Sequence, residues 1–207
     1  MSMRISIEEH PLLELESFEA EFSTPIGELV SPDSCADLLT GTAENVRDDE
    51  TKAAVRRMLR HGGYRPAGRG KPASEFLVQA SEKGILSAIN PPVDACNIAS
   101  LWGGLPISVV DADLASGSLS VSIPPEGSSY VFNASGQEIT LTGLLCLHDE
   151  VGPCANAVKD SQRTKTHPGT TRVLAVVWGT SELPGRASEV ADRFRGLLTE
   201  AGARVQP

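Results

Sequence analysis

A run of eight polar residues, 159–166, stands directly before a long apolar segment and carries the side chains best suited to chemistry. It contains an acid, three bases and several hydroxyl or amide groups in a row. Such groups can orient a substrate and stabilise developing charge without a covalent nucleophile. The same run is also what an ordinary polar loop at a strand entrance looks like, with Asp160 and Lys165 as a plain ion pair.

Sequence motifs of nucleophilic, metal and nucleotide chemistry are missing from the chain. It has no GxSxG, HExxH, P-loop or GxGxxG pattern, and nothing supports a triad built from its scattered histidines. The four cysteines form no CxxC pair, and the spacing of Cys146, His148 and Cys154 matches no standard zinc site. We therefore expect buried free thiols, no metal and no cofactor.

A second informative stretch, residues 90–114, reads as a helix, a glycine turn and a strand. Asp94 can cap the helix, a glycine pair can end it, and Pro106 prevents a restart before the apolar strand 107–110. The arrangement is common in proteins. On its own it indicates either the wall of a pocket or ordinary packing.

Together the two stretches resemble the tRNA-editing domain, the third and fourth modules, of the phenylalanyl-tRNA synthetase beta subunit. The matching pattern is an Asn on the helix, then Gly-x-Pro, then a strand that ends in Asp with another acid two residues later. The polar run resembles the free-standing members of that family. The residues that carry the match are Asn97, Gly104-Leu105-Pro106, Asp111, Asp113, Lys159-Asp160-Ser161-Gln162 and Thr164-Lys165-Thr166. The resemblance covers roughly residues 50–180 and says little about 1–45 or 182–207.

The resemblance implies an editing hydrolase that removes a wrong amino acid from the 3′ end of tRNA by water attack on the ester. By this analogy Lys159 or Lys165 would steady the phosphate or the oxyanion, and Asp160 would hold the ammonium group or the water. The catalytic candidates are therefore Asp160 and Lys165. The substrate-binding candidates are Asn97, Gly104, Pro106, Ser108, Asp111, Lys159, Ser161 and Thr166. The two polar segments should then line one cavity.

One position departs from the family pattern and leaves other functions open. Ser108 stands where the bacterial synthetase carries a histidine, so tyrosine rejection is not expected and the amino-acid specificity has changed. One alternative is a non-catalytic module that binds tRNA or an amino-acid-like ligand. Another is a small-molecule hydrolase unrelated to tRNA, which the net negative charge would suit.

The charge of the chain is strongly uneven along its length. The formal net charge is −9, yet residues 1–50 alone carry −11 and the remainder carries +2. Residues 52–71 hold seven bases and no acid, which predicts contact with a nucleic-acid backbone. The nucleic-acid-binding candidates are Arg56, Arg57, Arg60, Arg65, Arg69 and Lys71. Arginines at the end of a helix also complement its dipole, which is a sufficient structural reason for the first three.

Length and composition place the chain among ordinary globular proteins. At 207 residues and 40% apolar content we expect a single domain over 1–207. No apolar run approaches the ~20 residues that cross a bilayer, and the first ten residues lack a signal-peptide core. We expect a cytoplasmic protein with tRNA as partner, no membrane and no DNA. The oligomeric state does not follow from the sequence.

The hydrophobic pattern predicts an α+β fold with a largely antiparallel sheet. Helices gather in the first half and at the C-terminus, and strands gather in the second half. The predicted helices are 48–61, 75–83, 94–102 and 188–201, with an acidic helical or loop piece around Leu12–Leu15. The predicted strands are 4–7, an edge strand at 19–22, 107–110, a meander through 119–147, and 172–178, which should be covered on both faces. In the family, such helices back the pocket.

Overall fold

The computed structural model describes residues 4–40 and 45–206, so positions 1–3 and 41–44 of the predicted acidic N-terminal region lie outside the described residues. The fold is α+β, as the sequence predicts. The helices are α1 (Ser34–Leu39), α2 (Asp49–Arg60), α3 (Ala73–Glu82), α4 (Pro91–Gly103) and α5 (Arg186–Glu200). The strands are β1 (Ile5–Ile7), β2 (Leu13–Glu21), β3 (Ile107–Asp111), β4 (Leu119–Ser122), β5 (Ser129–Val131), β6 (Glu138–Thr140), β7 (Cys146–Asp149), β8 (Gly152–Asn156), β9 (Arg172–Thr180) and β10 (Arg204–Gln206).

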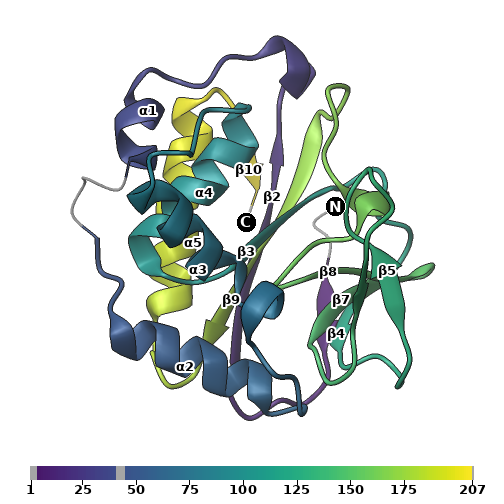
Figure 1. Cartoon of the computed structure of the whole chain (residues 1–207). Coiled ribbons are helices and arrows are strands. Elements are labelled where there is room, and N and C mark those ends of the chain that lie inside the picture. The colour runs from purple at the N-terminus through teal and green to yellow at the C-terminus, as the bar shows by residue number, and fades with distance from the viewer. Residues whose placement is uncertain (1–3, 41–44, 207) are drawn as a thin grey trace.

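A central antiparallel sheet with strand order β10-β2-β9-β3 divides the molecule into two sides. Helices α4 and α5 cover one face, and a second sheet with order β1-β4-β7-β8 packs against the other (Figure 1). β1 pairs with β4 in parallel, whereas the other described pairs are antiparallel. Strands β5 and β6 pair with each other as a separate hairpin. The fold therefore has a helical layer and two sheet layers.

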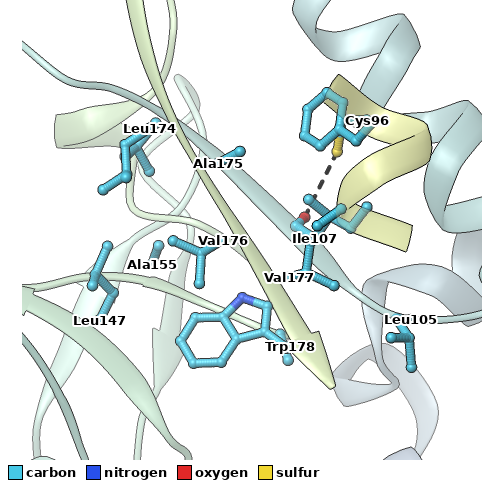
Figure 2. Packing of buried hydrophobic residues seen from close by; sticks show 14 of the residues in the cluster. Cys96, Leu105, Ile107, Leu147, Ala155, Leu174, Ala175, Val176, Val177 and Trp178 are labelled. Atoms are coloured by element: carbon cyan, nitrogen blue, oxygen red, sulfur yellow. Dashed lines mark hydrogen bonds between the residues drawn. The ribbon is translucent and has the colours of Figure 1, made fainter. Parts of the chain in front are cut away.

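Strand β9 is the core of the central sheet and is buried on both faces, as its apolar sequence predicts. Because side chains alternate along a strand, Val176 and Trp178 face the second sheet, beside Leu147 and Ala155 (Figure 2). Val177 faces the helices instead. Fully burying one large apolar side chain contributes roughly 1.5–3 kcal/mol. Because β9 buries several such side chains, it is a major source of stability.

Helices α4 and α5 approach closely because a glycine stands at their contact. A Cβ built on Gly103 would lie 2.1 Å from Cγ2 of Val190, a fully buried β-branched side chain that cannot turn away cheaply. We therefore expect Gly103→Ala to destabilise the protein by roughly 1–3 kcal/mol. Chemical denaturation measures this, with Gly196→Ala, at an unobstructed position on α5, as the control. Equal stability of the two variants would contradict the packing argument.

Several predicted helix boundaries are confirmed and others are wrong. Asp48 caps α2 by accepting from the backbone N–H of Thr51 at 2.7 Å, as expected. Helix α4 begins earlier than predicted because Asn90, not Asp94, accepts the capping hydrogen bond, and two prolines fill the first turn. Asp94 is buried inside the helix, where its carboxylate accepts from the N–H of Ile89.

Helix α3 buries a different face from the one its sequence suggests. Pro72 stands at the cap position and makes no side-chain capping bond. Phe76, a large apolar residue of this helix, is 37% exposed. Glu75 is buried because Arg56 of α2 reaches it with two charge-assisted hydrogen bonds of 2.6 and 2.7 Å. A cross-helix ion pair therefore overrides the apolar pattern.

The first strand of the central sheet was misjudged from the sequence. Residues 13–15, predicted as a helical or loop piece, begin the nine-residue strand β2. β2 is also not an edge, because the unpredicted strand β10 pairs with it on the side away from β9. The meander, predicted through 119–147, likewise stopped short of β8, which lies beyond it.

Within the described ranges, no helix is both long enough and apolar enough to span a bilayer.

Candidate functional site

The two polar segments singled out in the sequence meet at the outer edge of β3. Ser108 lies opposite Val176 in the register and therefore faces the second sheet. Its hydroxyl donates to Oδ1 of Asp160 at 2.7 Å. A β-bridge between Val110 and Lys165 continues the contact along the same edge. Segment 159–166 thus runs beside β3, about fifty positions away in sequence.

A buried tryptophan fixes the direction of the Ser108 hydroxyl. The indole N–H of Trp178, which can only donate, lies 2.9 Å from Oγ of Ser108. That oxygen accepts from the indole and donates its own hydrogen to Asp160 at 2.7 Å, the nearer of two acceptors, since the carbonyl of Asn156 lies at 3.3 Å. Ser108 and Trp178 are both fully buried. The serine is therefore a fixed donor to the carboxylate rather than a free nucleophile.

The carboxyl group of Asp160 is held where proton transfer near neutral pH is feasible. The residue keeps partial solvent exposure, but the protein around it desolvates its carboxyl group. Burial raises the pKa of Asp160 to about 6, against the opposing effects of the Ser108 hydroxyl, the N–H of Asn156 and the Lys165 charge. A carboxyl with a raised pKa is a candidate general base.

Asn156 and Tyr130 extend this network to the β5–β6 hairpin. The side-chain amide of Asn156 donates to the hydroxyl of Tyr130, which itself donates to the carbonyl of Lys159 at 2.5 Å. The other end of the Asn156 amide accepts from the backbone N–H groups of Val158 and Lys159 at 2.8 and 2.9 Å. Burial raises the pKa of Tyr130, so it stays neutral. The network fixes the backbone that carries Asp160.

The two lysines of the polar segment both contact Phe132, just beyond strand β5. The ammonium of Lys165 donates to the carbonyl of Phe132, and that of Lys159 lies 4.0 Å from the centre of its ring. The pKa of Lys159 is lowered, first by burial and then by the neighbouring charges of Arg69 and Lys165. Three cations therefore crowd together at this point.

A cavity of about 520 Å³ opens beside Lys159, between the β5–β6 hairpin and the basic loop, residues 64–71, that follows α2. Its lining residues are Tyr64, Arg69, Gly70, Phe132, Gln137, Glu138, Ile139, Thr140 and Lys159. Ser108, Asp160 and Lys165 are not among these lining residues. Neither of the two described cavities is lined by both polar segments, which instead contact each other directly through Ser108 and Asp160 and through Val110 and Lys165. A shared cavity therefore stays a prediction.

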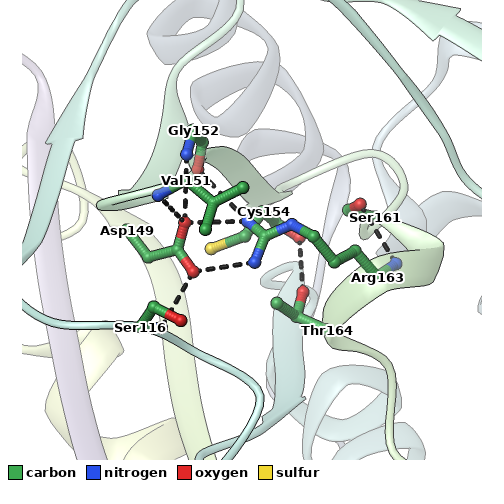
Figure 3. Close-up of polar contacts among 8 residues, drawn as sticks. All are labelled: Ser116, Asp149, Val151, Gly152, Cys154, Ser161, Arg163 and Thr164. Carbon is green, nitrogen blue, oxygen red and sulfur yellow. Dashed lines mark hydrogen bonds and ion pairs between the residues drawn. The ribbon is translucent and has the colours of Figure 1, made fainter.

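A buried ion pair that the sequence analysis did not anticipate anchors the polar segment to the β7–β8 hairpin (Figure 3). Arg163 makes two hydrogen bonds of 2.8 Å to the carboxylate of Asp149, whose side chain is fully buried. Ser161 and Thr164 add hydrogen bonds to the carbonyl of Cys154 at 2.9 and 3.0 Å. Ser161 also caps the short 3-10 turn Gln162–Thr164. Ser161 therefore stabilises the local fold, and its binding role stays a prediction.

Three further residues of the predicted binding set have other partners. Gly104, with φ of +77°, lines a different cavity of about 540 Å³ between α2 and α3. The carbonyl of Pro106 accepts from the backbone N–H of Trp178. Asp111 accepts from Thr170 at 2.5 Å and from the N–H of Asp113 at 2.9 Å, which holds the turn after β3.

The other two members of that set are not joined to the cluster. Asn97 lies partly exposed on α4, and no described hydrogen bond links it to Ser108 or Asp160. Thr166 is partly exposed at the end of the polar segment. Their predicted binding roles stay predictions.

The predicted basic surface divides into paired and unpaired residues. Arg56 is paired with Glu75, and Arg57 with Glu50 and Glu182, so both contribute to the fold. The remaining four candidates form no ion pair within the described ranges. Three of them are exposed and Lys71 is half-buried; the exposed ones are Arg60, Arg65 and Arg69. Arg69 alone among the six lines the cavity beside Lys159.

The cysteines are all buried free thiols, as expected. Burial raises the pKa values of Cys96, Cys146 and Cys154, which makes them poor nucleophiles. In the described part of the chain, no group of three or more metal-ligating side chains comes together.

Sequence reasoning missed the residues that support the polar segment from other elements. Tyr130, Asn156 and Trp178 stand in apolar or turn contexts whose pattern signals only strands. Their polar atoms matter because buried amide, phenol and indole groups require partners. A tryptophan within the apolar run of β9 was the available sequence signal, because its buried indole N–H needs an acceptor. The sequence does not show that the acceptor is Ser108.

Comparison with known proteins finds a partial structural similarity and no sequence match. No family model and no curated protein matches the chain. Among solved structures it is similar to an N-terminal fragment of the phenylalanyl-tRNA synthetase beta subunit from Pyrococcus horikoshii, at 15% identity and a TM-score of 0.47. The match covers 55% of this chain and 40% of that chain, so less than half of the fragment is spanned.

Proposed function

We propose that the cavity beside Lys159 binds the 3′ end of an aminoacylated tRNA and that the protein hydrolyses the aminoacyl ester. The observation that carries the proposal is the pairing of Arg69 and Lys159 on one cavity with the aromatic residues Tyr64 and Phe132. Cations bind phosphates, and aromatic rings give bases a surface on which to stack. The residue pattern shared with the synthetase editing domain supports tRNA as the particular RNA.

The electrostatics of the cavity favour an anionic ligand. Lys159 loses basicity through burial and through repulsion from Arg69 and Lys165. A phosphate placed between Arg69 and Lys159 would relieve that repulsion. It would also accept hydrogen bonds from these two cations, neither of which forms an ion pair with an acid within the described structure. Glu138 is the one acid on the lining, so the cavity stays positive. The overall negative charge of the chain lies mainly in the first fifty residues, away from this loop in sequence.

The hydrolytic step assigns Asp160 and Lys165 their proposed roles. Ionised Asp160 takes a proton from a water molecule as the water oxygen attacks the ester carbonyl carbon. The ammonium of Lys165 stabilises the oxyanion, and the bond to the ribose oxygen then breaks as that oxygen takes up the proton held by Asp160, which returns to its ionised form. The products are a free amino acid and uncharged tRNA. No covalent intermediate with the protein is involved.

A non-catalytic RNA-binding module is the second candidate, and one observation favours it. Asp160 is hydrogen-bonded to Ser108 and does not line the cavity. A buried carboxyl in a satisfied network can be purely structural. The cavity would then bind RNA without turnover. Measuring binding and hydrolysis separately distinguishes the two functions.

RNA binding tests the cavity first. We expect Arg69→Gln and Lys159→Gln each to weaken binding of a tRNA, and to reduce the slope of log affinity against log salt by about 1, because each removes one phosphate contact. Fluorescence anisotropy with labelled tRNA measures both. Arg204→Gln is the control, since Arg204 is an exposed arginine on β10, at the opposite edge of the central sheet from β3.

Two outcomes would remove this proposal. Affinity that does not change with salt in the wild-type protein would mean that phosphates are not contacted. Equal binding by Arg69→Gln, Lys159→Gln and Arg204→Gln would place the RNA elsewhere on the molecule.

A further inference from the structure

We propose that the β5–β6 hairpin is a gate between the cavity and Asp160, and that Tyr130 is the residue that keeps it shut. The proposal uses the same site as the proposed function and takes its ligand from it. It adds a requirement that the static arrangement imposes: a ligand in the cavity reaches Asp160 only when the hairpin moves.

The hairpin is weakly attached to the two main sheets. β5 and β6 have three residues each and form ladder hydrogen bonds with each other but belong to neither main sheet. Most of their residues are exposed, with Tyr130 and Ile139 as the partly buried pair. An isolated two-stranded hairpin is marginally stable in water. Side-chain contacts with the body therefore decide its position.

Four of these contacts form a latch on the polar segment. The hydroxyl of Tyr130 is bonded to both the Lys159 carbonyl and the Asn156 side chain. The carbonyl of Phe132 accepts from Lys165, and the ring of Phe132 lies under the Lys159 ammonium. All four contacts end on residues 156–165. Breaking them would leave the hairpin held by the packing of Tyr130 and Ile139 against the core, and would disturb no ladder of either main sheet.

Tyr130 links the cavity wall to the network that holds the carboxylate. On the hairpin it lies directly opposite Ile139, which lines the cavity. At its other end the hydroxyl bonds to the side chain of Asn156, whose backbone N–H donates to Asp160 at 3.2 Å. The contacts from cavity wall to carboxylate therefore run through Ile139, Tyr130, Asn156 and Asp160. In the proposed gate, outward movement of Tyr130 breaks this chain of contacts and admits the ligand.

Lys159 couples the latch to the ligand. The same ammonium lines the cavity and contacts the Phe132 ring. A cation–π contact at a partly exposed site is weaker than a charge-assisted bond to phosphate. An anion in the cavity would therefore draw Lys159 from Phe132 and loosen one of the four contacts. Ligand binding and gate opening then favour each other.

Hydrogen exchange measured by mass spectrometry tests the gate without any ligand. We expect Tyr130→Phe to speed amide exchange in 129–140 and 156–160 by roughly tenfold, as for the loss of one or two hydrogen bonds. Ser129→Ala is the matched control, because its hydroxyl bonds to Glu138 within the hairpin at 3.1 Å. Equal exchange in the two variants overturns the gate. If Tyr130→Phe does not fold, Lys165→Met tests the same latch at Phe132.

A second arm uses a short single-stranded RNA as the probe. Saturating RNA should speed exchange of 129–131 in the wild-type protein, and Tyr130→Phe should bind the RNA several-fold more tightly because the latch no longer opposes opening. Slower exchange of 129–131 with RNA would contradict the coupling. Faster exchange in Tyr130→Phe together with no RNA binding would support the gate and remove the proposed function, so the two failures are distinguishable.

Discussion

Replacing Arg163 with Met should lower the free energy of unfolding by roughly 3–5 kcal/mol at pH 7. The side chain of Asp149 is fully buried. Its carboxylate accepts two side-chain hydrogen bonds of 2.8 Å, and Arg163 donates both (Figure 3). Met keeps the length of the stem but leaves the carboxylate without a countercharge. The backbone N–H groups of Ser116, Val151 and Gly152 still donate to it, so part of the stabilisation remains.

The pH dependence of stability separates this ion pair from a packing effect. Burial disfavours the charged form of Asp149, but the hydrogen bonds from Arg163 and the N–H groups of Ser116 and Gly152 outweigh it and lower its pKa. A lowered folded-state pKa gives stability that is complete above the unfolded value of about 3.9 and is lost as the pH falls further. The difference between wild type and Arg163→Met should therefore shrink in acid.

Arg204→Met is the control for that measurement. Arg204 also forms an ion pair, with Glu21, but their side chains are 75% and 43% exposed, so its loss should cost about 0–1 kcal/mol. Denaturant titrations at neutral and acidic pH give both values. Equal losses in the two variants at pH 7 would show that the buried pair does not hold the polar segment in place.

Local sequence patterns were sufficient for the elements that have one dominant cause. β9 was predicted because a continuous apolar run needs cover on both faces. Helix α2 was predicted because an aspartate cap precedes an amphipathic repeat. The start of β2 was not predicted as a strand. Its short run of leucines and glutamates was interpreted as a helical or loop piece. Pairing with β9 and β10 decides the matter, and pairing partners lie far away in sequence.

The site shows the same division between local and distant causes. That the two polar segments lie close together was expected only from the resemblance to the editing domain, and in the structure Ser108 contacts Asp160. The cavity itself is built by the hairpin and the basic loop, and no local pattern pairs those two. Nor could the sequence show that Arg56 and Arg57 are neutralised by acids from α3 and from the loop after β9.

Hydrolysis of aminoacyl-tRNA should depend on Asp160 more than on any other side chain. We expect Asp160→Ala to lower kcat/KM by about 10²–10⁴-fold, as for loss of a general base, and Lys165→Ala by about 10²–10³-fold, as for loss of an oxyanion contact. RNA affinity should change little in Asp160→Ala, because Asp160 does not line the cavity. Asp113→Asn is the control, since this exposed acid pairs with Arg172.

The pH profile gives that prediction its mechanism. Because burial raises the pKa of Asp160 to about 6, most molecules carry a protonated, inactive carboxyl below that pH. The rate of the wild-type protein should therefore rise about tenfold per pH unit up to about pH 6 and level off above it. A panel of mischarged tRNAs, corrected for spontaneous ester hydrolysis, measures the profile. Full activity in Asp160→Ala would make the carboxyl structural, and no turnover with any bound tRNA would leave the RNA-binding module, because the cavity residues act without Asp160.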